Sequence, residues 1–402
     1  MRILFFSYSY WPPDFGGELL IALERFHSLV TEYGVAVSVF TAGKPGFPSS
    51  EWRDDIQVFR TPVLHTSRWG RAARRLLFAL LGIWAILFWQ YDVVHFGSLP
   101  GLGGAGDAFL GLLYAVLARL RGKRSVWVHS LADDENQTVR FHGFEGLVKR
   151  AFFSQVRYLV AVSPALADGL RSFFSQVVLL PYGIRDDLFT PLSSEERFLV
   201  RNNYQIREED VIFTFLGSIG RRKGFDVLAQ AFSELAQTHL HWHLWVVGPR
   251  TRAENQNLDE QEVAEVTAPL AGLDGQVHYW GRINDRSALA KILGASDVFV
   301  FPSRREGMGV APLEAMSCGV PVILSRLPGI TDLANIEGKT GMYIPAGDVQ
   351  ALKRAMILLG ENDQLRKEMG MQSSQRIRES FGWKEHIRQW LNVYRGEFPL
   401  HE

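Results

Sequence analysis

The sequence predicts an α/β protein with two parallel-sheet domains in tandem. Short apolar runs of strand length alternate with longer helical patterns along most of the chain. This alternation stops once, near residues 181–210, and then starts again. At 402 residues the chain is long enough for about two to three domains, each able to bury its own core. Strands that alternate with helices form parallel sheets with helices on both faces.

The first half of the chain carries the first series of predicted strands and helices. Residues 3–6 form a short apolar run typical of a buried strand, and a Gly16-Gly17 turn and a helical pattern follow. The later strand candidates are residues 35–40, 56–60, 92–96, 125–129, 158–162 and 177–180. Helical stretches lie between most of them, so we predict one parallel-sheet domain over residues 1–182.

A polar stretch separates the two series. Pro181-Tyr182-Gly183 interrupts the alternation, and residues 186–210 contain Pro191 and many charges. We therefore predict an interdomain linker over residues 183–210. The strand candidates that follow are residues 211–216, 243–247, 277–281, 298–301, 320–324 and 341–344, which predict a second domain over 211–380. Ligands of such sheets bind at the carboxyl ends of strands, so we expect the site in a central cleft faced by both domains.

Charge and composition exclude several classes of protein. The chain has 43 basic and 43 acidic residues and is 47% hydrophobic, which excludes a disordered chain and a globally basic nucleic-acid binder. No apolar run reaches the roughly 18–20 residues that a membrane span needs. The zero net charge hides a split, because residues 1–180 carry a net +4 and residues 181–402 a net −4. We therefore expect no nucleic-acid partner, but a local basic surplus in the first half.

The sequence also favours a cytoplasmic location. Cys318 is the single cysteine, which excludes an intramolecular disulfide and fits a reducing compartment. The N-terminus shows no signal-peptide pattern, since one Arg precedes a short apolar run and no small-residue cleavage site follows.

The most informative motif is the segment 303–316, which follows the apolar strand at 298–301. Glu306 and Glu314 are separated by seven residues, and Gly307-Met308-Gly309-Val310 lie between them at the predicted start of a helix. Glycines allow a ligand to approach the backbone closely, and the free N–H groups at a helix start favour an anion. A carboxylate at Glu314 can hold a vicinal diol, as acidic residues hold ribose in nucleotide folds. Taken singly, either glutamate is also explained as an ordinary residue of a capped helix.

Residues 303–322 resemble the E-x7-E signature of glycosyltransferase family 4, the retaining glycosyl transferases group 1 with the GT-B fold. The resemblance covers almost the whole chain, because Gly16-Gly17, Leu180-Pro181-Tyr182-Gly183-Ile184, Lys223-Gly224 and Phe381-Gly382-Trp383 fit in order. It implies two Rossmann-like parallel-sheet domains that face a central cleft. It also implies a C-terminal helix, 381–402, that crosses back to the N-terminal domain.

The resemblance implies a role for each candidate site residue. Glu314 would bind the donor ribose, and Glu306 would contact the transferred sugar. Lys223 and Arg222 would neutralise the donor diphosphate, which agrees with the need for fixed positive charge where a nucleoside diphosphate departs. Gly307, Met308, Gly309, Val310, Gly16 and Gly17 would line the donor site with backbone, and His129 would contact the donor sugar. The chain departs from the family at Gly217-Ser218, where an Arg often follows the Gly, and we expect Arg222 to substitute.

These residues predict a retaining glycosyltransferase. It would move a sugar from a UDP- or GDP-type donor to a hydroxyl of a glycan or lipid-linked acceptor in cell-surface polysaccharide, lipopolysaccharide or glycolipid synthesis. We expect no metal and no cofactor apart from the nucleotide sugar, since no metal-ligand cluster is visible in the sequence. A nucleotide-sugar epimerase of the same fold and a non-catalytic partner subunit are the alternatives.

A basic and apolar stretch at residues 68–89 has two interpretations. Arg68, Arg71, Arg74 and Arg75 precede fourteen uncharged residues, 76–89, which are too few to span a bilayer. Clustered Arg beside Trp and Phe is typical of a helix at a membrane interface, which would make the protein peripheral at an anionic membrane. A core helix of the first domain with an exposed basic start is the other interpretation.

Overall fold

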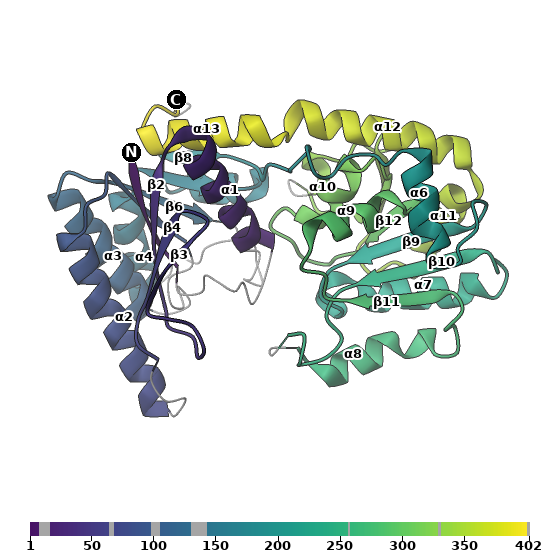
Figure 1. The fold of residues 1–402 in the computed structure, drawn as a ribbon, viewed down its shortest axis with the longest axis horizontal. Helices are drawn as coiled ribbons and strands as arrows, with labels where there is room; N and C mark the ends of the chain where they lie inside the picture. Colours follow the sequence, from purple (N-terminus) through teal and green to yellow (C-terminus); the bar gives the residue numbers. More distant parts are fainter. Residues whose placement is uncertain are drawn as a thin grey trace. The chain divides into compact units, whose positions relative to one another are not determined.

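The chain forms two compact units, each with its own sheet. The computed structural model describes residues 1–7, 17–63, 68–97, 105–129, 143–255, 258–328 and 331–399. One unit contains residues 1–181 and 384–402, and the other contains residues 182–383 (Figure 1). Both sheets are parallel except for one edge strand, and helices connect most of the strands. The prediction of two parallel-sheet α/β domains is confirmed.

The first unit holds an eight-stranded sheet within the described residues, in the order β3-β4-β2-β1-β5-β6-β7-β8. Only β3 pairs antiparallel, at the edge beside β4. The strands β1, β5 and β7 are apolar almost throughout and buried on both faces, as central parallel strands must be. The strand bounds are β1 (Arg2–Phe6), β2 (Ala36–Thr41), β3 (Ser50–Arg53), β4 (Ile56–Arg60), β5 (Val93–Phe96), β6 (Arg124–His129), β7 (Tyr158–Ala161) and β8 (Val177–Leu179).

Helices of the first unit pack against one another as well as against the sheet. Their bounds are α1 (Gly17–Tyr33), α2 (Arg68–Phe88), α3 (Ala105–Leu120), α4 (Gly143–Gln155), α5 (Pro164–Arg171) and α13 (Trp383–Arg395). The Tyr114 hydroxyl on α3 donates to the carbonyls of Phe78 and Ala79 on α2, at 3.1 Å each. A Cβ on Gly82 would lie 2.1 Å from that hydroxyl, so only glycine permits this approach of α2 to α3.

A buried aromatic cluster holds α13 in the first unit. The Tyr394 hydroxyl lies 2.8 Å from His95 Nδ1 at the core of the sheet. The Trp390 ring stacks on His95 with centroids 5.4 Å apart, and the Arg25 guanidinium lies 3.8 Å from the Trp390 ring. Burial, with Arg25 adding to it, lowers the pKa of His386 to about 3 and lowers the pKa of His95 well below its ordinary value. The C-terminal helix is therefore part of the first unit's core.

The second unit holds a six-stranded parallel sheet within its described residues, in the order β11-β10-β9-β12-β13-β14. Its strands are β9 (Val211–Leu216), β10 (Trp242–Val247), β11 (Val277–Gly281), β12 (Val298–Phe301), β13 (Val322–Ser325) and β14 (Gly341–Ile344). Its helices are α6 (Ser194–Asn202), α7 (Phe225–Ala236), α8 (Glu260–Thr267), α9 (Arg286–Gly294), α10 (Val310–Ser317), α11 (Val349–Glu361) and α12 (Asp363–Ser380). Short 3-10 turns, among them η1 (Arg221–Lys223), connect some of these elements.

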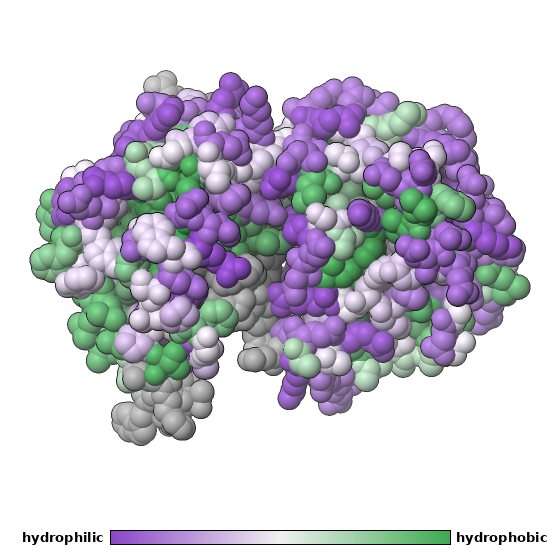
Figure 2. Space-filling view, in the orientation of Figure 1, coloured by the Kyte–Doolittle hydropathy of each residue, from purple (hydrophilic) through white to green (hydrophobic). Residues whose placement is uncertain are grey.

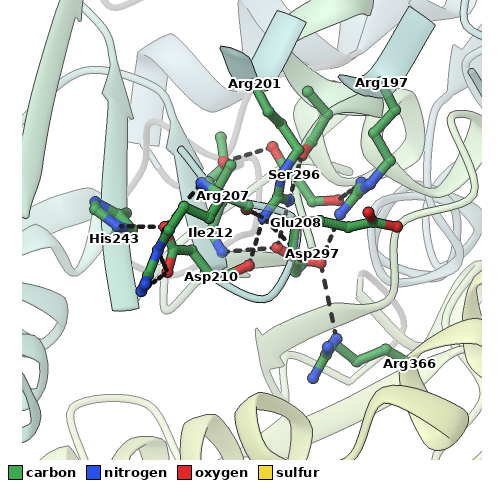
Figure 3. A network of polar contacts seen from close by, with 12 residues as sticks. Arg197, Arg201, Arg207, Glu208, Asp210, Ile212, His243, Ser296, Asp297 and Arg366 are labelled. Carbon is green, nitrogen blue, oxygen red and sulfur yellow. Dashed lines mark hydrogen bonds and ion pairs between the residues drawn. The ribbon is translucent and has the colours of Figure 1, made fainter. Parts of the chain in front are cut away.

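The segment 183–210, predicted to be an interdomain linker, is instead packed into the second unit. It contains α6, which starts with a capping box at Ser193 and Glu196. Arg197 and Arg201 of this helix donate to the Asp297 carboxylate at 2.6 and 2.9 Å (Figure 3). The Arg201 side chain is 3% exposed. The prediction was wrong because these charges, which look like those of a solvated linker, pair with a carboxylate about 100 residues further along the chain.

Removing the Asp297 charge should destabilise the second unit. In Asp297→Asn the buried guanidinium of Arg201 and the partly exposed guanidinium of Arg197 lose their counterion. Breaking a buried pair from one side costs about 3–5 kcal/mol. Asp168→Asn is the matched control, because the Asp168 side chain is 73% exposed and its pair with Arg171 is worth at most about 1 kcal/mol. Urea unfolding monitored by circular dichroism measures both. Equal losses in the two variants would contradict the role of Asp297.

Stability should fall as the pH falls below about 6.5, the ordinary pKa of histidine. His95 and His386 stay neutral in the folded state and take up protons only on unfolding. Proton uptake therefore lowers the free energy of unfolding progressively as the pH falls below that value, and leaves it unchanged well above that value. Each contributes a loss of about 1 kcal/mol between pH 7 and pH 5.5. His386→Gln should remove its share of this pH dependence in urea-unfolding measurements at the two pH values. An unchanged pH dependence would show that His386 titrates normally.

Candidate active site

Two loops meet at the carboxyl ends of the neighbouring strands β9 and β12. One runs from Gly217 to Gly224 and the other from Pro302 to Gly309. The Ser303 hydroxyl and the Arg304 N–H both donate to the carbonyl of Arg222, at 3.2 and 2.9 Å. Gly224 has a φ of +71°, and a Cβ there would lie 1.8 Å from the Pro302 carbonyl oxygen. Only glycine satisfies both conditions, so Gly224 allows the loops to pack backbone against backbone.

The two loops carry an ion pair between Lys223 and Glu306. Lys223 Nζ donates to Glu306 Oε1 at 2.6 Å, and the Ser303 hydroxyl donates to the same oxygen at 2.7 Å. The side chains are only 16% and 7% exposed. Lys223 Nζ also lies 4.9 Å from the Phe301 ring centroid. The predicted lysine and the first predicted glutamate are therefore brought together, each nearly removed from water.

Arg222 contributes differently from Lys223. Its main-chain carbonyl joins the two loops, while its side chain is exposed and forms no ion pair within the described part of the chain. Arg304, whose N–H donates to the Arg222 carbonyl, makes a bidentate pair with Asp226 at 2.7 and 2.8 Å. Burial alone would raise the pKa of Asp226, but the hydrogen bonds and charge of Arg304 hold it below its ordinary value. Arg304 is thus committed to the fold, and Arg222 is available to an external anion.

The glycine loop turns directly into α10. Gly309 caps this helix with a φ of +78°, and Val310 is its first residue. Met308 is buried, and its Sδ accepts a hydrogen bond from the Tyr182 N–H at 3.2 Å. The first N–H groups of α10 have no intrahelical acceptor and carry the positive end of the helix dipole. The start of α10 is therefore suited to phosphate oxygens.

Glu314 is held by an arginine that the sequence did not single out. Arg286 donates to Glu314 Oε1 at 2.7 Å, and the two side chains are 17% and 4% exposed. The Arg286 guanidinium lies 4.6 Å from the Phe189 ring centroid, which fixes it from its other side. A signal was present, because Arg286 follows the N-cap Asp285 and a cation at a helix start opposes the dipole.

The remaining predicted site residues belong to the first unit. His129 is the last residue of β6 and pairs with Ala161 of β7, but its side chain lies outside the described part of the structure. Gly17 is the first residue of α1, and Gly16 falls outside the described residues. Their roles stay predictions. Cys318 is buried, and burial raises the pKa of its thiol, as expected for a packed cysteine.

Two family models match most of the chain. "Glycosyl transferases group 1" matches residues 196–376 and "Glycosyl transferase 4-like domain" matches residues 25–183. The fold and these matches define a glycosyltransferase of the GT-B class, and the chain belongs to the glycosyl transferases group 1, family 4. The family predicted from the sequence is confirmed.

Individual relatives match between about half and nearly all of the chain. D-rhamnosyltransferase WbpZ of Pseudomonas aeruginosa is 30% identical over 394 residues, which are 95% of this chain and 92% of that protein. O-antigen chain mannosyltransferase B of Escherichia coli is 29% identical over 52% of this chain and 51% of its own length. Among solved structures, sucrose-phosphate synthase from Thermosynechococcus elongatus has a TM-score of 0.79 at 21% identity, covering 98% of both chains. Anabaena Alr3699/HepE in complex with UDP has a TM-score of 0.74 at 18% identity, covering 98% and 100%. These two structures share the fold.

Proposed function

We propose that this glycosyltransferase retains the anomeric configuration while it moves a sugar from a nucleotide-diphosphate donor to a hydroxyl of a glycan or lipid-linked acceptor. The observation that carries the proposal is the buried Lys223–Glu306 pair beside the start of α10, with Glu314 one turn further along that helix. This arrangement offers a cation for a diphosphate and carboxylates for hydroxyl groups within one unit. The named activities of the relatives support a role in lipopolysaccharide or other cell-surface polysaccharide synthesis.

The donor would be bound along α10 and the loop before it. Its diphosphate would accept hydrogen bonds from the backbone of Gly307, Met308, Gly309 and Val310 and from Lys223 and Arg222. The ribose hydroxyls would lie at Glu314, and the hydroxyls of the transferred sugar would lie at Glu306. For Gly16, Gly17 and His129, a contact with the donor stays a prediction of the family resemblance. The HepE structures that hold UDP and UDP-glucose support a nucleotide donor, with UDP and GDP both open.

The charge that develops in the reaction fits these residues. The bond between the sugar C1 and the diphosphate oxygen breaks, and its electron pair stays on the departing diphosphate. The acceptor oxygen bonds to C1 on the same face, and its proton passes to the departing phosphate oxygen. Lys223 and Arg222 stabilise the negative charge that grows on the leaving group, which is the task otherwise given to a bound cation. We propose that the reaction takes place in the cytoplasm without metal or further cofactor.

The test is a panel of UDP-, GDP- and ADP-sugars with lipid or oligosaccharide extracts, in which release of nucleoside diphosphate is measured. Acceptor-dependent release supports the transferase. Interconversion of the donor sugar without an acceptor would identify the epimerase alternative. No release and no thermal shift with any nucleotide would identify a non-catalytic subunit.

Loss of either member of the buried ion pair should lower turnover strongly. Lys223→Ala and Glu306→Ala should each lower kcat by more than tenfold, because each removes a group that stabilises the transition state or orients the sugar. The matched control is Lys353→Ala, which breaks a pair with Glu234 at 2.5 Å between α11 and α7. Steady-state assays on variants with unchanged melting temperatures provide the measurement. Wild-type turnover in both site variants would refute the assigned roles.

Arg286 should act on donor binding through Glu314. Arg286→Met keeps the stem beside Phe189 but removes the charge that orients the carboxylate, so the Kd for a nucleoside diphosphate should rise about tenfold, equivalent to about 1.4 kcal/mol. With the 2′,3′-dideoxy nucleotide the variant and the wild type should bind equally, because the ribose hydroxyls are absent. Arg286→Lys should restore part of the affinity. An equal loss with both nucleotides in calorimetric titrations would contradict a role at the ribose.

A further inference from the structure

Helix α2 exposes an unbroken apolar stripe. The exposed members are spaced four residues apart, with one more beside the last: Leu76 at 62%, Leu80 at 55%, Trp84 at 51%, Phe88 at 67% and Leu87 at 37%. Residues at i and i+4 share a helix face, so these side chains form one band along the helix. No polar side chain interrupts residues 76–88. Singly exposed apolar residues are normal on a protein surface, but an aligned set of five marks an interaction site.

The opposite face of α2 is fully packed. Phe78, Ala85 and Ile86 are buried, and Gly82 lies against Tyr114 of α3. The helix is thus a core helix on one side, as one of the two sequence interpretations expected, and its apolar stripe remains outside. Since the buried face already fixes α2 in the first unit, the stripe is not required for the packing of this helix.

Further apolar side chains are exposed on α3, which packs against α2, and on α4, which packs against α3. They are Phe109 and Leu120 on α3, and Phe144 and Leu147 on α4, between 59% and 78% exposed. The helix α3 contacts both α2 and α4. Figure 2 shows hydrophobic surface over the part of the first unit where α2 and α3 lie.

Basic residues flank the stripe at both ends. The first two turns of α2 carry Arg68, Arg71, Arg74 and Arg75, and residues 68–88 contain no Asp or Glu. At the other end, Arg121 donates to the carbonyls of Ile86 and Trp89, at 2.6 and 3.0 Å. Lys123 lies 5.9 Å from the Tyr91 ring centroid at the same end. An apolar band between two groups of cations matches a surface with an apolar interior and anionic head groups.

We infer that α2 is an in-plane docking element for an anionic lipid bilayer. No helix in the described part of the chain is long and apolar enough to cross a membrane, so the element would lie on the bilayer. A second copy of the chain fits less well. Whether two α2 helices pair parallel or antiparallel, cations at one helix end meet cations of the partner, and α2 supplies no acidic residue to offset them. Lipid head groups supply that negative charge.

Vesicle sedimentation with the full-length protein tests the inference. The probes are vesicles of phosphatidylcholine alone and of phosphatidylcholine with about 30% phosphatidylglycerol. The wild type should bind the anionic vesicles at least tenfold more strongly, and salt should weaken the binding because surface charges are screened. Leu80→Glu/Trp84→Glu should lower binding at least tenfold, and Arg71→Gln/Arg75→Gln should remove the preference for anionic lipid. The matched control is Leu240→Glu/Met371→Glu, which alters residues 71% and 65% exposed in the second unit and should bind like the wild type.

The alternatives give distinct results. Absence of binding to anionic vesicles, or equal loss in the Leu80/Trp84 and Leu240/Met371 variants, would overturn the inference. A dimer in light scattering that Leu80→Glu/Trp84→Glu converts to a monomer would also overturn it, in favour of a second copy of the chain. Nucleotide titrations and melting curves of the same variants show whether they fold. These measurements also keep the test independent of the proposed function, since α2 belongs to the first unit and the Lys223–Glu306 pair to the second.

Discussion

Buried carboxylates paired with cations are the constraint on which the second unit depends. The side chains of Glu306, Glu314 and Asp297 are 7%, 4% and 9% exposed, and each accepts a hydrogen bond from a Lys or Arg at 2.6–2.9 Å. An unpaired carboxylate at such depth would cost several kcal/mol or lose its charge. Two of them stand at opposite ends of β12, with Asp297 just before the strand and Glu306 in the loop after it. The ion pairs therefore fix the elements around this strand at both ends.

The ion pairs at the two ends of β12 differ in whether the cation can exchange its carboxylate for another anion. At the Asp297 end, Arg201 also donates to the carbonyls of Ala295, Arg207 and Asp210, so both of its terminal nitrogens are committed to the fold (Figure 3). At the other end, Lys223 has a compact ammonium on a flexible stem, which suits exchange between anions. A diphosphate can replace Glu306 as its partner if the freed carboxylate finds sugar hydroxyls. In this exchange the Lys223 ammonium stays paired with an anion, and the freed Glu306 carboxylate accepts hydrogen bonds from neutral hydroxyl groups.

The sequence predicted the features that a local pattern of residues encodes, such as strands and motif spacing. It missed the features that depend on ion pairs between residues far apart in the chain. Apolar runs such as residues 298–301 identified the strands, and the seven-residue spacing brought Glu306 and Glu314 to one loop and helix. The linker prediction failed because a solvated charge and a buried one look alike in sequence, and Asp297 lies far along the chain from Arg197. Arg286 was missed for the same reason, since its partner is 28 residues away. For α2, composition showed an apolar helix, and only packing against Tyr114 showed which of its faces is buried.

The net charge of zero has a different physical meaning in each unit. In the second unit the buried cations balance buried carboxylates, so their charge is largely neutralised inside the fold, and Lys223 becomes available only by exchange. In α2 the arginines have no acidic neighbour within the helix, and the adjoining apolar side chains face outward. A cation with a fixed carboxylate partner stabilises the fold. A cation that can exchange its partner, or that has no carboxylate in its own helix, can bind an external anion. The position of carboxylates, more than the number of cations, therefore decides which basic residues are available to bind ligands.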